Sequence, residues 1–206
     1  VPFYAGSVPP ETVAGIALAV ARVRERAGAT PVGINVLRND ARAALGIAAA
    51  TGARFVRINV HTGTMLTDQG LIEGRAAETL RERARLAPGV AIFADVHVKH
   101  AVPLGAERLI DAASAARERG LADALVVSGR ATGAAPPLER VAELRAALGA
   151  LAPLVLGSGV DLGNARQLLA TADGALVGSS LKRGGRVDAE VDEARVAALT
   201  LRFFRR

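Results

Sequence analysis

Residues 90–100 have the sequence VAIFADVHVKH, and this stretch decides the fold. Its first seven positions are almost all apolar and lack the polar alternation of a strand that faces water on one side. Such runs are typical of strands buried on both faces in a parallel sheet. Parallel strands need long crossover connections, which are usually helices. The stretch therefore predicts an α/β fold with polar residues at the point where this strand ends.

Five further runs of the same kind cover residues 31–37, 54–60, 124–128, 153–156 and 174–177. Segments rich in Ala, Leu, Arg and Glu with helical spacing lie around them, at about 11–27, 39–51, 74–86, 106–119, 138–149, 162–171 and 189–204. Strand followed by helix, six times over, predicts right-handed crossovers and a parallel sheet. No linker or change of composition interrupts the pattern, so we expect one domain over residues 1–206.

Two architectures fit six strand–helix units. A doubly wound sheet usually carries a G-x-G-x-x-G turn or a Walker A motif, and neither follows any predicted strand. A (β/α)8 TIM barrel fits better, with a lone helix and its leading loop in front of the six units. The chain also starts with Val1 rather than Met. We therefore expect an N-terminally truncated barrel of about six parallel strands, lacking the first strand, first helix and second strand.

Composition excludes several classes of protein. The 206 residues include no Cys, which rules out a disulfide framework, a thiol nucleophile and a Cys-ligated zinc site. The net charge is +6, but Arg alternates with Glu and Asp on predicted helices, and the chain has one Tyr and no Trp. These features are not typical of a nucleic-acid surface. The longest uncharged run, residues 146–160, is too short to span a bilayer. We expect a cytoplasmic protein, with peripheral membrane association as an alternative.

Every His and Lys of the chain lies just after a predicted strand. They are His61, His97, Lys99, His100 and Lys182. In a parallel barrel the carboxyl ends of the strands share one face, and active sites are found there. The distribution therefore predicts that the strand ends surround a common pocket.

The end of the strand at 90–96 has the highest concentration of ionisable side chains. Asp95, His97 and Lys99 alternate with valines, so extended backbone would place all three on one face. An Asp–His pair would orient a general base, and a desolvated Lys would serve as a phosphate partner or an imine-forming nucleophile. Asp95, His97 and His100 would also suit a divalent metal. The sequence does not distinguish among these roles. The structural alternative is an ion pair at the end of the strand.

The strand at 54–60 is followed by polar residues and a long loop. Asn59 and His61 alternate with apolar neighbours, which predicts that both point to one side of the strand. The loop at 64–74 contains Asp68, and a loop of this length in a barrel is often a lid. The structural alternatives are that Asn59 fills the barrel interior and that Asp68 caps the next helix.

Three later strand ends are rich in small residues. Ser128-Gly129 follows one strand, Gly157-Ser158-Gly159 follows the next, and Gly178-Ser179-Ser180 with Lys182 follows the last. Glycines leave backbone N–H groups free to face an anion, and barrels often bind phosphate with the loops after strands 7 and 8. The last two turns therefore predict a phosphate site. An ordinary glycine-rich turn is the alternative for Ser128-Gly129.

These motifs, taken in order, resemble the BtpA/SgcQ family. The resemblance rests on residues 59–63, 67–74, 93–101, 127–129, 157–160 and 177–182, and it runs from the opening loop to the final helix. It implies a ribulose-phosphate-binding type barrel, and the family is named for a role in photosystem I biogenesis with peripheral membrane association. His61 and His97 stand at positions that vary in the family, which favours Asp95, Lys99 and His100 as catalytic residues, together with Asp68.

Two functions follow as expectations. The first is an enzyme or binding protein for a small phosphorylated metabolite, with any divalent metal and the reaction left open. The alternative is a non-catalytic factor for the biogenesis of a membrane complex, with a docking patch around residues 202–206. Self-association into a homo-oligomer is a further expectation. A third interpretation, an inactive fragment with exposed sheet edges, follows if two strands are missing.

Overall fold

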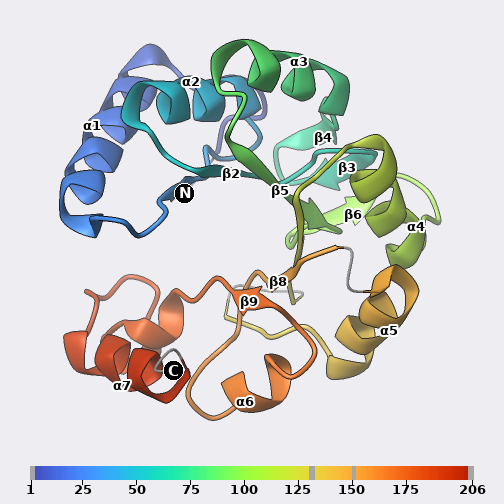
Figure 1. The fold of residues 1–206 in the computed structure, drawn as a ribbon. Helices are drawn as coiled ribbons and strands as arrows, with labels where there is room; N and C mark the ends of the chain where they lie inside the picture. The colour runs from blue at the N-terminus through green and yellow to red at the C-terminus, as the bar shows by residue number, and fades with distance from the viewer. Residues whose placement is uncertain (1–2, 130–132, 150–151, 204–206) are drawn as a thin grey trace. The chain divides into compact units, whose positions relative to one another are not determined.

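The structure is a computed structural model that describes residues 3–129, 133–149 and 152–203, with the side chains of residues 202 and 203 left aside. The chain divides into two compact units, Val1–Leu125 and Val126–Arg206, and each is described by itself. Figure 1 gives the labels of the helices and strands.

The first unit is built on parallel strands β1 (Gly33–Ile34), β2 (Phe55–Ile58) and β5 (Ala91–Val96). Phe55 lies opposite Gly33 on one side and opposite Ala91 on the other. Strand β7 (Ala124–Val127) begins beside β5, because the Asp123 N–H donates to the Ile92 carbonyl at 2.8 Å. Val56 and Ile92 are fully buried, which explains the unbroken apolar runs in the sequence.

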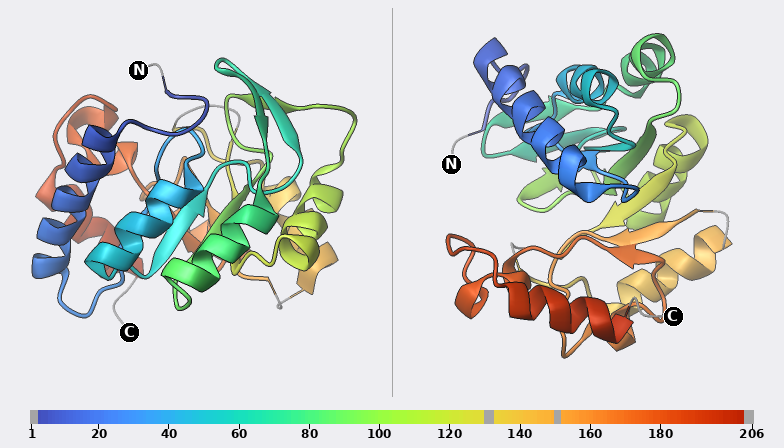
Figure 2. Two further views of the ribbon diagram at one scale, coloured as in Figure 1. Left: turned by 90° about the horizontal axis from the view of Figure 1, so that it is seen from above. Right: turned by 60° about the vertical axis from the view of Figure 1, so that its left-hand side comes forward.

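The helices of the first unit are α1 (Pro10–Ala27), α2 (Ala41–Thr51), α3 (Ala76–Leu86) and α4 (Leu109–Ser114), which continues into a π-helical turn at Ala115–Arg119. Helices α1 to α3 lie along the outer side of β1, β2 and β5 (Figure 2). Helix α2 begins at a capping residue, since Asp40 accepts the Ala43 N–H at 2.9 Å. Its buried Leu45 and Ile47 belong to the same apolar cluster as Val56 and Ile92.

The second unit continues the strand–helix alternation. It contains the second half of β7, strands β8 (Leu154–Leu156) and β9 (Gly174–Ala175), and helices α5 (Leu138–Leu148), α6 (Ala165–Leu168) and α7 (Glu193–Phe203). Strands β8 and β9 are parallel, with Val155 opposite Gly174. The Gly157 N–H donates to the Val127 carbonyl at 2.7 Å, so β8 ends beside β7. Short 3-10 turns at Ser179–Leu181 and Arg183–Gly185 precede α7.

The six predicted strands and the α/β class are confirmed. Within each unit a strand neighbours the next one along the chain: β1-β2-β5-β7 in the first unit and β7-β8-β9 in the second. A doubly wound sheet would reverse this order at some point, and a barrel does not. The predicted helices are also present, although α6 is shorter than the predicted 162–171 and α4 starts later than residue 106.

The prediction of an irregular loop at residues 64–74 was wrong. This segment is a hairpin of β3 (Thr64–Thr67) and β4 (Gly70–Glu73), and β6 (Ala101–Pro103) adds a third antiparallel strand. A two-residue turn joins the hairpin strands, and Gly70 has a φ of 99°, which suits glycine. The strands escaped prediction because their apolar stretches, Met65-Leu66 and Leu71-Ile72, are only two residues long and so resemble neither a buried run nor an alternating strand.

In each unit, an aspartate just before a strand forms the same set of hydrogen bonds to a neighbouring strand and a helix. In the first unit the Asp123 carboxylate accepts the Ile92 N–H at 2.8 Å and the Arg83 Nη1 proton at 2.8 Å. In the second unit the Asp173 carboxylate accepts the Leu154 N–H at 2.7 Å and a short hydrogen bond from Arg145. Each aspartate therefore ties the start of its own strand to the neighbouring strand and to a helix.

No helix in the described part of the chain combines the length and the apolarity that a membrane crossing needs.

Candidate functional site

The carboxylate of Asp95 is the centre of a polar cluster in the first unit. Arg57 of β2 holds it with two hydrogen bonds, Nε to Oδ1 at 2.8 Å and Nη2 to Oδ2 at 3.0 Å. The Asn59 side-chain amide donates to Oδ2 at 2.7 Å. Arg57, Asn59 and Asp95 come from the carboxyl-terminal ends of neighbouring parallel strands, so the sheet itself aligns them.

A second layer of amides orients this cluster. The Asn35 Nδ2 group, just after β1, donates to the Arg57 carbonyl at 2.9 Å and to Asn59 Oδ1 at 3.2 Å. Asn59 can then turn only its NH2 group toward Asp95. A chain of hydrogen bonds thus connects the ends of β1, β2 and β5.

Burial governs the electrostatics of Asp95. Its side chain is 1% exposed, and this burial raises the pKa of Asp95 above the ordinary value. The charge and hydrogen bonds of Arg57, the hydrogen bond from Asn59 and the charge of Lys99 act in the opposite direction. The site therefore holds an acid that keeps its proton to higher pH than a solvated aspartate does.

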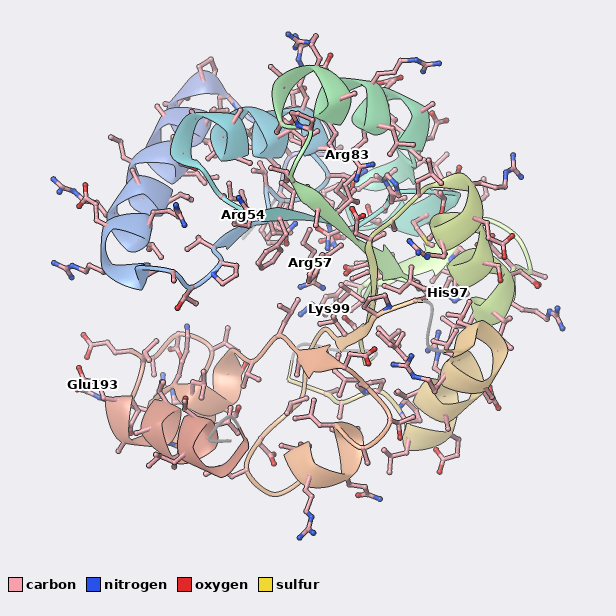
Figure 3. The ribbon with its side chains drawn as sticks, in the orientation of Figure 1. Arg54, Arg57, Arg83, His97, Lys99 and Glu193 are labelled. Atoms are coloured by element: carbon pink, nitrogen blue, oxygen red, sulfur yellow. The ribbon has the colours of Figure 1, made fainter. Side chains whose placement is uncertain are left out.

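Lys99 supplies an amine to the same cluster. Burial lowers its pKa, the nearby charges of Arg57 and Arg38 lower it further, and Asp95 partly compensates. Figure 3 shows the Arg57 and Lys99 side chains near each other at the ends of β2 and β5. Within the described part of the chain, the Lys99 amine forms no hydrogen bond or ion pair. Two cations, Arg57 and Lys99, therefore lie near one buried carboxylate, and the direct ion pair is made by Arg57.

Arg38 connects the cluster to the hairpin. Its side chain is 6% exposed, and it donates from Nε to Gln69 Oε1 at 3.0 Å and from Nη2 to Asp68 Oδ1 at 3.1 Å. The Phe3 ring lies 5.5 Å from its guanidinium. Desolvation raises the pKa of Asp68, but hydrogen bonds from Gln69 and the backbone, together with Arg38, outweigh it and lower the pKa. Asp68 thus binds Arg38 rather than capping a helix.

The structure places His97 and His100 differently from the sequence expectation. Strand β5 ends at Val96, and the φ angles of 50° at His97 and 59° at His100 break the extended alternation. His97 points away from Lys99 in Figure 3, and its Nε2 lies 3.7 Å from Glu107 Oε2. His100 is exposed. In the described ranges, no three His, Cys, Asp or Glu side chains gather closely enough for a metal ion, so Asp95, His97 and His100 do not form such a set.

His61 is also separate from Asp95. Its ring is 1% exposed, and its Nε2 lies 2.7 Å from the carbonyl of Gly120, at the end of the π-helical turn. Burial lowers its pKa, and the hydrogen bond to Gly120 only partly opposes that effect. The backbone leaves the extended conformation after Ile58, so Asn59 and His61 do not share one side of a strand.

The predicted phosphate turns lie in the second unit. Gly159 has a φ of 75°, and a Cβ atom there would lie 2.0 Å from the Ala135 nitrogen. The Ser158 hydroxyl accepts the Gly129 N–H at 3.3 Å and donates to the Ala134 carbonyl at 2.8 Å. The turn after β8 is therefore packed tightly against Gly129, Ala134 and Ala135. Residues 130–132, which follow the predicted Ser128-Gly129 turn, lie outside the described residues.

The turn after β9 is more open. A Cβ atom on Gly178 would meet nothing within 4 Å. The Ser180 hydroxyl donates to the Val160 carbonyl at 2.7 Å, which joins this turn to the one after β8. Ser179 begins the 3-10 turn, and the Lys182 amine donates to the Val187 carbonyl in a short hydrogen bond. Lys182 is thus engaged by its own loop.

Ser128 is buried at the end of β7, and its hydroxyl has no hydrogen-bond partner among the described residues. A buried hydroxyl without a partner is unfavourable, so this position is suited to contact a ligand or an ordered water.

A cavity of the first unit lies elsewhere. A cavity of about 510 Å³ opens between the start of α2, the first turns of α3 and strand β4, and Arg42, Glu78 and Thr79 are among its lining residues. Asp95 and Lys99 do not line it. We base the candidate site on the polar cluster, because the cavity's charged side chains mostly pair with each other, as Arg42 does with Glu82 at 3.8 Å.

The sequence profile of the BtpA family matches residues 1–203. The chain belongs to the BtpA family. This confirms the resemblance carried by the strand-end motifs.

Two relatives illustrate the range of the BtpA family. The photosystem I biogenesis protein BtpA of Synechocystis sp. is 50% identical over 197 residues, which covers 96% of this chain and 68% of that protein. An uncharacterized protein of Thermococcus kodakarensis is 45% identical over 188 residues, covering 91% and 70%.

Solved structures with a similar fold are barrel enzymes. Thiamine phosphate pyrophosphorylase from Pyrococcus furiosus has a TM-score of 0.59 and 18% identity, and the match covers 95% of this chain and 77% of that one. N-(5'-phosphoribosyl)anthranilate isomerase from the same organism has a TM-score of 0.60 and 13% identity, covering 90% and 79%. At this identity the likeness establishes only the fold, an α/β arrangement like that of a TIM barrel.

Sequence reasoning missed three residues of the polar cluster: Asn35, Arg38 and Arg57. Arg38 stands just after the predicted strand at 31–37, as the chosen residues do, and this signal could have identified it, whereas Asn35 is a lone polar residue inside that run. Arg57 lies inside an apolar run, where a lone charge implies a buried partner.

Proposed function

We propose that this BtpA-family chain binds a small phosphorylated metabolite and acts on it. The single observation that carries the proposal is the Lys99 amine, which lacks a partner in the described chain beside the buried Arg57–Asp95 pair. A partly desolvated ammonium group without a directly paired counter-ion is unfavourable. An anionic ligand that contacts Lys99 would remove this cost.

In the proposal, the first unit supplies charge and proton transfer. Arg57 and Asn59 fix the Asp95 carboxyl group in one orientation. Asp95, with its raised pKa, serves as a general acid or base, and Lys99 stabilises negative charge on the ligand. Asn35 acts as a positioning residue, because it binds Arg57 and Asn59. Arg38 positions the hairpin, because it binds Asp68 and Gln69.

For the second unit, taken by itself, we propose a phosphate-binding site at its glycine turns. Two glycine turns follow consecutive strands, β8 and β9. The Ser180 hydroxyl of the second turn donates a hydrogen bond to the Val160 carbonyl of the first. The orphaned Ser128 hydroxyl lies at the end of the preceding strand. Two barrel enzymes of similar fold have a phosphorylated compound in their names, which supports this class of ligand without identifying it.

Calorimetric titration with ribose 5-phosphate, with ribose as the matched neutral ligand, tests the proposal. We expect binding of the phosphate ester only, weakened at least tenfold by Lys99→Met. Lys99→Arg keeps the charge and should retain more affinity. Arg26→Met removes an exposed cation from α1 and should leave binding unchanged. No heat from ribose 5-phosphate, inorganic phosphate or any other sugar phosphate would refute phosphate-ester binding.

The relative in Synechocystis supports a second candidate function. At 50% identity, a role in the biogenesis of a membrane complex is a proposal for this chain too. The patch predicted around residues 202–206 cannot be placed, since residues 204–206 and the side chains of 202 and 203 lie outside the described structure. Co-sedimentation of the chain with membranes from its own source would support this function. Loss of co-sedimentation after deletion of residues 202–206 would assign it to the tail.

A further inference from the structure

We propose that the outer face of the β4-β3-β6 sheet is a dimer surface that binds a second copy of this chain. The inner face of this small sheet is packed against other residues of the same chain. Met65 and Ile72 are each 4% exposed and pack with Val60 and Val98 into a separate apolar cluster. The hairpin is therefore anchored by one face, which leaves the other toward solvent (Figure 2).

The outer face carries a continuous apolar row. Leu71 of β4 lies opposite Leu66 of β3, and Leu66 lies opposite Val102 of β6. These side chains are 57%, 52% and 64% exposed. Leu104 is 64% exposed, and its N–H donates to the Thr64 carbonyl at 2.9 Å, so it continues the ladder beyond β6. Neighbouring strands lie about 4.8 Å apart, so the row forms one patch.

This arrangement departs from the usual pattern of a small antiparallel sheet. A sheet with one face on a core normally presents polar side chains on the other. Here the two central positions of each hairpin strand are apolar, so the face toward solvent is apolar as well as the buried one. Four aliphatic side chains, each more than half exposed, approach the roughly 300–600 Å² of the largest patches on monomeric proteins. Patches of that size commonly mark an interaction surface.

A second copy fits this patch for two reasons. The four side chains carry no charge, so the patch is complementary to itself, as a two-fold interface requires. A stable interface buries about 800 Å² on each partner, and somewhat more than half of that is apolar. A patch of this size supplies the apolar centre, and Thr64 and Glu73, which lie opposite each other at the end of the hairpin, supply part of a polar rim. Leu66 is central and would lie near the two-fold axis.

Sedimentation equilibrium over about 1–100 μM protein tests the proposal directly. We expect a dimer whose dissociation constant rises at least 100-fold in Leu66→Lys, because like charges then meet across the axis. Leu18→Lys is the matched control, since Leu18 is 71% exposed on α1, and it should leave the dimer unchanged. Val102→Lys is the second variant if Leu66→Lys folds poorly, which circular dichroism would reveal.

Cross-linking provides an independent test, because the chain has no cysteine. Leu66→Cys should give a covalent dimer with a short bis-maleimide, and Leu18→Cys should not. A wild-type chain that stays monomeric throughout the concentration range would overturn the proposal. So would a dimer that Leu66→Lys and Val102→Lys weaken no more than Leu18→Lys does.

Discussion

At the residue scale, Asp95 is buried while Lys99 beside it is partly exposed. Arg57 satisfies Asp95 with a bidentate ion pair, and the proposal assigns the Lys99 amine to an anionic ligand. A buried ion pair is costly to form and more costly to break, because the remaining partner keeps its desolvation penalty.

Removing the Asp95 charge tests this balance. Asp95→Asn leaves the Arg57 guanidinium without its counter-charge, and we expect a loss of about 3 kcal/mol in the free energy of unfolding. Urea denaturation at pH 7 measures it. Asp111→Asn removes an exposed carboxylate that pairs with Arg108, and its denaturation midpoint should match the wild type. Equal midpoints for both variants would contradict a structural role for the Arg57–Asp95 pair.

Lys99 gives a direct test of the electrostatics. Reductive ¹³C-methylation labels only Lys99, Lys182 and the N-terminus, so NMR can follow Lys99 through a pH titration. We expect Lys99 to lose its proton below the ordinary pKa of lysine, since burial and Arg57 disfavour its charge. Asp95→Asn removes the compensating charge and should lower the pKa of Lys99 further. An unchanged pKa in that variant would separate Lys99 from the cluster.

At the element scale, Asp123 and Asp173 fix the first residues of their strands by hydrogen bonds. The Leu154 N–H, Arg145 and its own backbone amide lower the pKa of Asp173 against an opposing desolvation effect. Because the folded pKa lies below the unfolded one, this contribution is present above about pH 4 and is lost as the pH falls through the folded pKa.

Asp173→Asn should therefore cost about 1 kcal/mol at pH 7, a figure reduced for the half-exposed carboxylate. The difference in unfolding free energy between wild type and variant should shrink as the pH falls below about 4. Urea denaturation at several pH values measures both. A difference that stays constant down to pH 2 would show that the Asp173 charge is not involved.

The two glycine turns should respond differently to a methyl group. Gly159→Ala meets the Ala135 backbone at a positive φ, so we expect a loss of at least about 3 kcal/mol. Gly178→Ala has open space and a φ of −127°, so it should cost less than about 1 kcal/mol. Thermal unfolding compares the two variants. Similar melting temperatures would contradict the close packing at Gly159.

At the scale of the whole molecule, the sequence predicted the main strands and the family, but only part of the polar cluster. Runs such as residues 90–96 predicted strands because burial on both faces leaves no alternation. Asp95 and Asn59 were predicted because strand ends gather polar groups. Arg38 was not, because the strand-end signal was applied only to His, Lys, Asp and Asn side chains. The hairpin was missed because its apolar stretches, Met65-Leu66 and Leu71-Ile72, are only two residues long.

The central claim is that this chain binds the phosphate group of a small metabolite. Two-dimensional ¹⁵N NMR of the wild-type chain, titrated with ribose 5-phosphate, tests it most directly. In the second unit we expect saturable shifts of the amides in Gly157–Gly159 and Gly178–Ser180, and in the first unit a shift of the Lys99 amide, with none on adding ribose. Shifts that are absent from these amides, or identical for ribose and ribose 5-phosphate, would contradict it.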